Sequence, residues 1–310
     1  MKPRIVAVTG PTAVGKTECT LKLARAIDAE IVSCDSMQLY KYLDIGSAKP
    51  TPEERAQVRH YLVDEIDPAG EFSVAKYKKL AERAIDEILG KGKVPLVTGG
   101  TGLYLDSILY DMDFGPEPAA GTSQRRAELI KYAETEGNEA LHALLEKQDP
   151  EAAARIHPNN VVRVARALEA AERGEKIAPF TDSRRKSGKY DAILIGLTRD
   201  RQELYDRINM RVGMMIDAGL VDEVRGLRGR GLTRGDISMK GIGYKEIFDY
   251  LDGSCTLDEA ADTIRKNTRH FAKRQMTWFR RYDDIKWFCL TGRDEDEVAE
   301  EITKWVRKRL

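Results

Sequence analysis

The chain has 310 residues, and its 51 Lys and Arg residues are balanced by 51 Asp and Glu residues. That length suffices for one large domain with an elaboration, or for two domains. No apolar run approaches the roughly 18 residues that a membrane-spanning helix needs, so the composition excludes a membrane-embedded class. The four cysteines are scattered without the C-x-x-C spacing of a zinc site. We therefore expect a protein of the reducing cytoplasm.

The first predicted elements are a strand, a glycine-rich loop and a helix. Arg4–Thr9 is a short β-branched run that indicates a buried strand, and Glu18–Ala26 has helical periodicity. Between them, Gly10–Thr17 fits the G-x-x-x-x-G-K-[ST] phosphate-binding loop in full. Lys16 would reach the outer phosphates, and the Thr17 hydroxyl suits Mg²⁺, the expected cofactor. The residues expected around a diphosphate or triphosphate are Gly10, Pro11, Thr12, Ala13, Val14, Gly15, Lys16 and Thr17.

Two further loops follow predicted strands. Ala29–Cys34 and Lys93–Thr98 are predicted strands, with a helix over Ser73–Leu89 between them. Alternating strands and helices predict a parallel sheet with right-handed crossovers, which is an α/β fold. Ligands of open α/β sheets bind at the carboxyl ends of the strands. We therefore expect residues 35–38 and 99–104 to lie beside the phosphate site.

Asp35 and Thr101 are the candidate reactive side chains of these loops. The Asp35 carboxylate can hold Mg²⁺ through water or act as a general base; the alternative is a turn or helix N-cap residue. Glycines around Thr101 permit close approach of the backbone to a ligand, and its hydroxyl can bond there. The alternative for this loop is an ordinary strand-to-helix turn.

The acid that usually accompanies a phosphate-binding loop is missing. Phosphate-loop NTPases hold Mg²⁺ with an acidic residue at the end of a second strand. The candidate strands end at Thr98 and Thr198, and neither supplies a carboxylate. The sequence therefore argues against a protein that is driven by ATP hydrolysis. It favours a loop that binds a diphosphate which is released as the leaving group of a reaction.

The pattern changes in the middle of the chain. Gln124–Gly174 is helical throughout, and Asp191–Leu197 returns to a strand. We predict a helical insertion domain over residues 115–190, within a core domain of residues 1–114 and 191–310. The expected fold class is a P-loop NTPase-like parallel sheet flanked by helices, with an all-helical insertion and a helical C-terminal region.

The C-terminal third contains two features of interest. Arg207 and Arg211 are four residues apart, so they share one helix face and can clamp an anion; the alternative is a solvated pair. Met210, Met214 and Met215 are predicted to be helix core. Arg265–Arg281 contains seven Lys and Arg residues and no acid, which is the local charge that an RNA or DNA footprint requires. The alternative is that this basic stretch packs against the acidic segment Asp294–Glu301.

These motifs together resemble bacterial tRNA dimethylallyltransferases. The resemblance runs in order from residue 4 to about residue 290, and Val14 and Leu39 are its two minor departures, neither of which carries a reactive group. The blocks that carry it are Gly10–Thr17, Asp35–Gln38, Gly99–Tyr104, His157–Arg163, Arg166–Glu169, Arg207–Arg211, Gly219–Val224, Lys240–Lys245 and Thr268–Phe279.

The resemblance implies a prenyl transfer. The five-carbon group of dimethylallyl diphosphate would pass to the exocyclic N6 of the adenosine immediately 3′ of the anticodon, in tRNAs that read codons beginning with U. Diphosphate would be released, with Mg²⁺ assisting. Asp35 would orient or accept an N6 proton, Thr101 would bond near the reacting centre, and Lys16 would stabilise the leaving diphosphate. Arg207 and Arg211 would clamp the same diphosphate.

The implied partner is the tRNA anticodon stem-loop, with its target base flipped into the crevice. We expect a monomer without membrane contact. The insertion and the basic C-terminal stretch would hold opposite sides of the RNA. The residues expected to contact tRNA are Asp35, Ser36, Met37, Gln38, Thr101, Asn159, Asn160, Val161, Val162, Arg163, Lys240, Gly241, Ile242, Gly243, Tyr244, Lys245, Lys273, Arg274, Arg280 and Arg281.

Two other functions remain open from the sequence. An adenylate dimethylallyltransferase would share the crevice, but it would not need the helical insertion or the basic C-terminal helices. A small-molecule kinase or RNA-binding ATPase would share the phosphate-binding loop, but the missing acid and the Asp35–Gln38 block argue against it.

Overall fold

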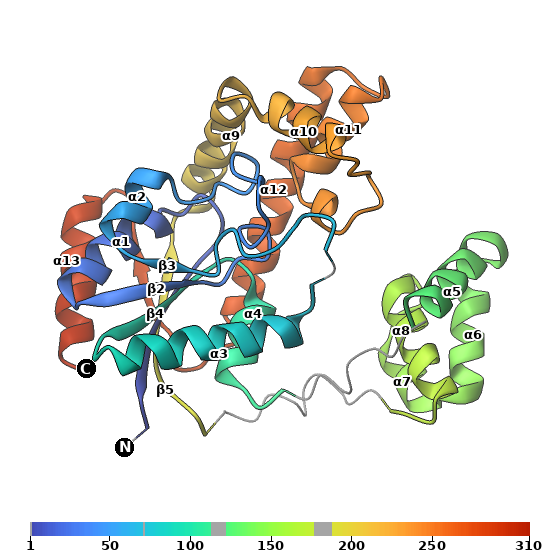
Figure 1. The fold of residues 1–310 in the computed structure, drawn as a ribbon, viewed down its shortest axis with the longest axis horizontal. Helices are drawn as coiled ribbons and strands as arrows, with labels where there is room; N and C mark the ends of the chain where they lie inside the picture. Colours follow the sequence, from blue (N-terminus) through green and yellow to red (C-terminus); the bar gives the residue numbers. More distant parts are fainter. Residues whose placement is uncertain (1, 71, 113–121, 177–187) are drawn as a thin grey trace. The chain divides into compact units, whose positions relative to one another are not determined.

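A computed structural model describes residues 2–70, 72–112, 122–176 and 188–310 of the chain. The chain divides into two compact units, Met1–Leu109 with Ser187–Leu310, and Tyr110–Lys186 (Figure 1). The predicted domain boundary near residue 115 lies outside the described residues. Each unit has its own hydrophobic core.

The first unit is built on a six-stranded sheet whose paired strands are all parallel, which confirms the α/β prediction. The strand order is β3-β2-β4-β1-β5-β6. Because β2, β4 and β1 are neighbours, the loops that follow these three strands meet at one end of the sheet. The strands are β1 (Arg4–Thr9), β2 (Ala29–Ser33), β3 (His60–Tyr61), β4 (Val94–Gly99), β5 (Asp191–Thr198) and β6 (Lys286–Cys289).

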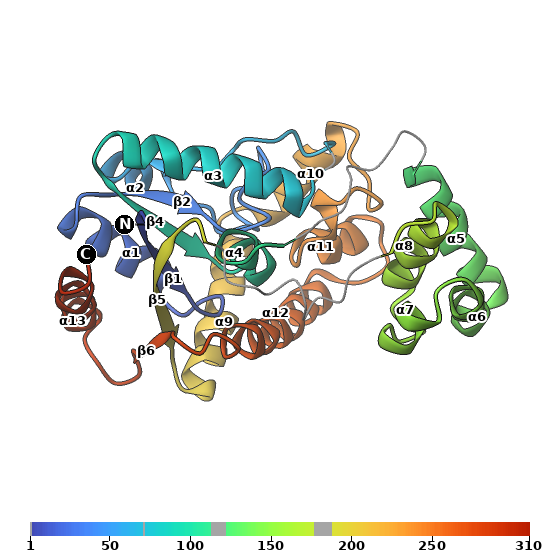
Figure 2. The same cartoon turned by 90° about the horizontal axis from the view of Figure 1, so that it is seen from below.

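Helices cover both faces of this sheet. The helix α3 packs on β2 and β4, while α1 covers the other face and in turn contacts α13 (Figure 2). Burial on both faces explains why the central strands are continuous apolar runs, such as the fully buried Ile5, Val6 and Val8 of β1. The helices are α1 (Lys16–Ala26), α2 (Pro52–Gln57), α3 (Val74–Gly90), α4 (Gly102–Leu109), α9 (Arg201–Asp217), α10 (Leu220–Gly229), α11 (Tyr244–Leu251), α12 (Leu257–Phe279) and α13 (Glu295–Arg307), with a 3₁₀ turn at Ser238–Lys240.

Two edge strands were not predicted from the sequence. The strand β3 has only two residues and pairs with Ile31 and Val32 of β2. The strand β6 has four residues and pairs with β5 beyond a mostly helical segment. Strands this short carry no measurable two-residue periodicity, so the pattern could not reveal them. No helix in the described part of the chain combines the length and the apolar character needed to cross a membrane.

The second unit is all-helical where it is described, as the sequence predicted. Its helices are α5 (Thr122–Glu136), α6 (Asn138–Gln148), α7 (Pro150–Arg155) and α8 (Val161–Glu172). Leu141, Leu145 and Val164 are fully buried at its centre. Asp149 begins α7 by accepting a hydrogen bond from Ala152 N at 3.0 Å, with Pro150 in the first turn.

Candidate active site

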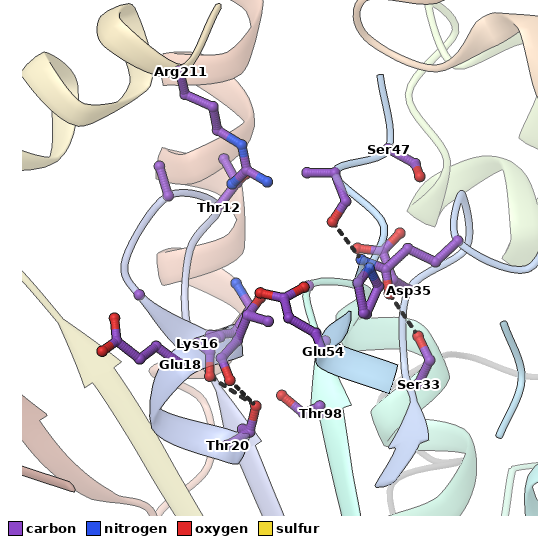
Figure 3. Close-up of a pocket in the computed structure, with 18 of the residues that line it drawn as sticks. Thr12, Lys16, Glu18, Thr20, Ser33, Asp35, Ser47, Glu54, Thr98 and Arg211 are labelled. Atoms are coloured by element: carbon purple, nitrogen blue, oxygen red, sulfur yellow. Dashed lines mark hydrogen bonds between the residues drawn. The ribbon is translucent and has the colours of Figure 1, made fainter. Parts of the chain in front are cut away.

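A cavity of about 490 Å³ opens at the carboxyl ends of β1, β2 and β4 in the first unit. Its walls come from the phosphate-binding loop, the loop after β2, the end of β4, and the helices α1, α2, α9, α12 and α13. Figure 3 shows Lys16 and Asp35 on opposite sides of the cavity, with Arg211 above them in that view. The predicted convergence of the three loops is therefore present in the fold.

The phosphate-binding loop joins β1 directly to α1, which begins at Lys16. The Lys16 ammonium donates to the carbonyls of Gly10 at 3.0 Å and Pro11 at 2.8 Å. Loss of hydration in the cavity lowers the pKa of Lys16 to about 8, against the opposing effect of Asp35. Arg211 lowers this pKa further. A diphosphate would attract the same ammonium away from neutral carbonyl oxygens.

Asp35 lines the cavity immediately after β2. Its Oδ1 accepts a hydrogen bond from Met37 N at 2.9 Å, which leaves Oδ2 for a ligand among the described contacts. Thr101 supports this loop from the side, because its Oγ1 accepts from Ser36 N at 3.0 Å. Gln38 also faces the cavity, and its Oε1 accepts from Ser33 Oγ at 3.0 Å. The sequence-predicted residues Asp35 and Gln38 thus lie in one loop, and the predicted residue Thr101 holds that loop through Ser36.

The loop after β4 approaches the loop after β2 very closely. A Cβ atom on Gly99 would lie 2.1 Å from the Cys34 carbonyl oxygen, so only glycine fits there. The neighbouring Gly100 accepts a hydrogen bond from Gln275 Nε2 at 2.9 Å, and Gln275 Oε1 accepts from Thr12 N at 2.9 Å. Gln275 is a site residue that the sequence reasoning missed, although it lies within a recognised block.

The helix α9 presents four residues to the cavity: Arg207, Met210, Arg211 and Met214. Their spacing of three and four residues places them on one helix face. Met210 and Met214 are 66% and 62% exposed, so the prediction that they belong to the helix core is wrong. The reason is the phase of the helix, whose buried face instead carries Leu204, Ile208 and Val212. Met215, by contrast, packs partly buried against a core cluster.

The two arginines of α9 have different surroundings. Arg207 Nε donates to the Ala13 carbonyl at 2.9 Å, and its Nη1 lies 3.4 Å from Glu295 Oε1. Arg211 is half-buried in the cavity wall, and loss of hydration there lowers its pKa, an effect opposed by Asp35. A half-buried guanidinium that lines a cavity favours an anionic ligand, which agrees with the predicted clamp.

Oxygen donors suitable for Mg²⁺ also line the cavity. Thr17 follows Lys16 at the start of α1, and Thr98 lies at the end of β4. The buried Thr98 Oγ1 has no hydrogen-bond partner among the described residues. No group of three or more His, Cys, Asp or Glu side chains in the described ranges could hold a metal by itself. A Mg²⁺ ion here would need phosphate oxygens and water as ligands, which is the usual mode for this ion.

The protein-family model described as IPP transferase matches residues 38–282, which is more than half of the chain. The chain belongs to the IPP transferase family. It is 48% identical over 306 residues to a tRNA dimethylallyltransferase of Alkaliphilus oremlandii, covering 98% of this chain and 97% of that protein. A tRNA dimethylallyltransferase of Clostridioides difficile is also 48% identical, over 99% of this chain and 98% of that protein.

Solved structures of IPP transferases have the same fold. The full-length tRNA isopentenylpyrophosphate transferase of Bacillus halodurans superposes with a TM-score of 0.74 at 44% identity, over 99% of this chain and 96% of that one. A eukaryotic dimethylallyltransferase acting on tRNA superposes with a TM-score of 0.79 at 25% identity, over 94% of this chain and 74% of that one.

Within this IPP transferase fold, the predicted RNA-binding block Lys240–Lys245 lies against the loop after β2. A Cβ atom on Gly241 would lie 2.5 Å from Met37 Cε. Tyr244 is fully buried, and its hydroxyl donates to Glu223 Oε1 at 2.8 Å. The prediction that the Tyr244 side chain contacts RNA is therefore wrong, because this side chain is part of the core. Lys240 is exposed and remains a candidate.

The basic residues of α12 and the following turn are exposed: Lys273, Arg274, Arg280 and Arg281. The acidic segment that follows them has other partners. Glu295 pairs with Arg199 and Arg207, Asp296 pairs with Lys22, and Glu301 pairs with Arg293. These contacts argue against the alternative in which the acidic segment neutralises the basic stretch.

The second unit contains the remaining predicted RNA contacts at the start of α8. Asn159, Asn160, Val162 and Arg163 are exposed, while Val161 packs against the core of the unit. Asn160 is the N-cap residue of α8, but its side chain makes no capping bond. Asn159 Oδ1 accepts from Asn138 Nδ2 at 3.2 Å. Asn160, and not Asn159, is therefore the residue that precedes the first turn of α8.

Proposed function

We propose that this chain transfers the dimethylallyl group of dimethylallyl diphosphate to N6 of the adenosine immediately 3′ of the anticodon, in tRNAs that read codons beginning with U. The observation that carries the proposal is the cavity at the carboxyl ends of the strands, across which Asp35 faces Lys16 of the phosphate-binding loop. The near full-length relatives are described as tRNA dimethylallyltransferases, which supports the same reaction.

The donor diphosphate would lie on the loop that precedes α1. Lys16 would exchange its two carbonyl partners for phosphate oxygens, and Arg207 and Arg211 would approach from α9. The exposed Met210 and Met214 on the same face offer an apolar surface to the five-carbon chain. A bound Mg²⁺ would supply charge that stabilises the leaving diphosphate, with Thr17 and Thr98 as the side chains suited to hold it.

The adenine N6 is a weak nucleophile, so position and proton removal both contribute to the rate. As N6 bonds to the allylic C1 of the donor, the C1–O bond breaks and its electron pair leaves with the diphosphate. Asp35 would accept the proton that N6 loses. In this proposal Thr101 acts by holding Ser36, and therefore the loop that carries Asp35, through its 3.0 Å hydrogen bond.

The anticodon stem-loop is the proposed RNA partner. Exposed basic side chains on α12 and exposed polar side chains at the start of α8 suit contacts to phosphates. We further propose that the chain acts as a monomer.

One assay tests the function. The purified chain is incubated with labelled dimethylallyl diphosphate and Mg²⁺, with either unmodified tRNA or AMP as the acceptor. Label should appear in the tRNA, and nuclease digestion should release it as N6-dimethylallyladenosine from the position 3′ of the anticodon. Label in AMP but not in tRNA would instead establish the free-nucleotide enzyme.

A further inference from the structure

The first turn of the C-terminal helix α13 contacts the phosphate-binding loop through Glu295. This residue lies beyond the residues that the family model matches, and no step of the proposed reaction uses it. Glu295 lines the cavity, and its Oε2 would lie 3.3 Å from a Cβ atom on Gly15. A carboxylate beside a loop that binds anions requires an explanation, because like charges repel.

Two arginines connect Glu295 to the loop. Arg199 Nε donates to the Val14 carbonyl at 2.9 Å, and Arg207 Nε donates to the Ala13 carbonyl at 2.9 Å. Ala13 has a φ of 63°, a left-handed conformation that residues other than glycine rarely adopt. The two guanidinium groups therefore hold an unfavourable turn of the loop, and Glu295 forms ion pairs with both of them.

The two arginines differ in how many of their guanidinium nitrogens form hydrogen bonds with the described residues. Arg199 is buried and uses its remaining nitrogens on Glu203, Glu295 and the Leu290 carbonyl. Arg207 uses Nε and Nη1, and within the described residues its Nη2 has no hydrogen-bond partner. Because Arg207 also lines the cavity, the contacts to Ala13 and Glu295 determine where its free nitrogen points.

Glu295 is itself held in place. The preceding residue, Asp294, caps α13 by accepting hydrogen bonds from Asp296 N at 2.8 Å and Glu297 N at 3.1 Å. Asp296 then forms an ion pair with Lys22 of α1. The start of α13 is thus fixed to the helix that follows the phosphate-binding loop.

We propose that Glu295 is a positioning residue for the donor: it holds Arg207 against the Ala13 carbonyl so that Nη2 of Arg207 meets the diphosphate. This inference rests on the proposed function, in which Arg207 binds the donor diphosphate. The opposite possibility is that Glu295 acts by direct repulsion of the diphosphate. Removal of its charge then strengthens donor binding, whereas loss of positioning weakens it.

The test is the Glu295→Gln variant, with inorganic diphosphate plus Mg²⁺ as the equilibrium probe. We expect its dissociation constant, measured by calorimetry, and the KM for dimethylallyl diphosphate to rise about tenfold, as for the loss of one charge-assisted contact. The KM for tRNA and kcat should stay within about twofold of wild type. The matched control is Glu301→Gln on the same helix, which removes an exposed ion pair with Arg293 and should leave all these values unchanged.

A double-mutant cycle separates positioning from a general effect on the fold. In an Arg207→Gln background, Glu295→Gln should add no further loss of diphosphate affinity. An equal loss in both backgrounds, or unchanged or tighter binding in the single variant, overturns the proposal. If Glu295→Gln does not fold, Glu295→Asp keeps the charge and shortens the reach, and it should show the same coupling. A wild-type chain that labels no tRNA refutes the proposed function, whereas the diphosphate titrations still test Glu295.

Discussion

Gln275 of α12 connects to Thr12 of the phosphate-binding loop: its Oε1 accepts a hydrogen bond from Thr12 N at 2.9 Å. The same amide group donates from Nε2 to the Gly100 carbonyl at 2.9 Å. Gln275 is only 5% exposed, so both bonds are shielded from water. A single side chain thus fixes the distance between the loop that would bind phosphate and the loop that contains Thr101.

Gln275→Leu should therefore weaken donor binding. The change keeps a similar volume but leaves Thr12 N and the Gly100 carbonyl unpaired, at a cost of about 1–3 kcal/mol. We expect the KM for dimethylallyl diphosphate to rise about tenfold or more and the melting temperature to fall by a few degrees. The control is Gln202→Leu, since the Gln202 side chain is exposed and donates a hydrogen bond to Asp206 of the same helix. A donor KM equal to that of wild type would show that the bridge is not needed for donor binding.

Lys16→Ala should remove most of the turnover. The ammonium would meet charge that builds on the leaving diphosphate, and loss of one such contact costs roughly 10²–10³ in rate. Single-turnover rates at saturating donor, with circular dichroism to verify folding, measure this effect. Near wild-type turnover in this variant is incompatible with the proposed role of Lys16.

The lowered pKa of Lys16 gives a prediction of pH dependence. Below its pKa of about 8 the ammonium is charged and attracts the diphosphate, and above this pH the free enzyme loses the charge. The value of kcat/KM for the donor reports groups of the free enzyme. It should fall about tenfold per pH unit above pH 8, while kcat falls less because the bound diphosphate favours the protonated amine. A flat kcat/KM profile up to pH 9.5 would show that the Lys16 ammonium is not the charge that attracts the diphosphate.

Asp35→Asn keeps the shape of the side chain and removes its charge. We expect a large drop in kcat with little change in tRNA affinity, because the proton is accepted in the transition state. The Met37 N–H can still donate to the amide oxygen, so the loop should persist. Filter binding and single-turnover rates separate the two effects. Normal turnover of a weakly bound complex would make Asp35 a binding residue only.

Replacement of Met210 and Met214 should change the KM for the donor and leave the KM for tRNA unchanged. Their combined replacement by Ala removes exposed apolar surface from the cavity wall, and covering such surface is worth roughly 1 kcal/mol at about 25 cal/mol per Å². The donor KM should rise about fivefold, with the tRNA KM unchanged. Met215→Ala, from the side of α9 that packs against the core cluster, is the control. A raised tRNA KM with a normal donor KM would place these side chains at the RNA.

The sequence predicted those parts of the fold that have long patterns or a motif. The strands β1, β2, β4 and β5 are apolar runs, and Gly10–Thr17 has a fixed spacing, so their positions followed from local chemistry. Convergence of Asp35 and Lys16 on the cavity followed from the rule that ligands bind at the carboxyl ends of parallel strands. Thr101 was predicted at the reacting centre, but it is not among the residues that line the cavity and instead bonds the loop that carries Asp35.

Other features depend on tertiary packing that a sequence does not display. Gln275 lies in a helix far along the chain, and nothing in its surroundings indicates that it bonds to Thr12. The phase of α9 was misjudged because methionine is common in cores, yet Met210 and Met214 face the cavity. Tyr244 was placed at the RNA because it lies in the Lys240–Lys245 block of the resemblance, but its ring fills the core beside Glu223.

The basic residues of α12 and of the turn that follows it give the prediction that concerns RNA directly. Replacing Lys273, Arg274, Arg280 and Arg281 with Gln should raise the dissociation constant for tRNA and flatten its salt dependence. Each phosphate neutralised contributes roughly −0.7 to −0.9 to the log–log slope, so fewer contacts give a shallower line. Donor binding should not change, because none of the four residues lines the cavity.

The matched control for this variant removes the same charge elsewhere. Arg225, Arg228, Lys304 and Lys308 are exposed on α10, on α13 and at the C-cap of α13, so their replacement by Gln lowers the net charge equally. If RNA binding depends only on net charge, the two quadruple variants will lose affinity alike. If α12 contacts the phosphates, only its own variant will flatten the salt slope. An unchanged slope in a folded α12 variant would show that this face does not meet RNA.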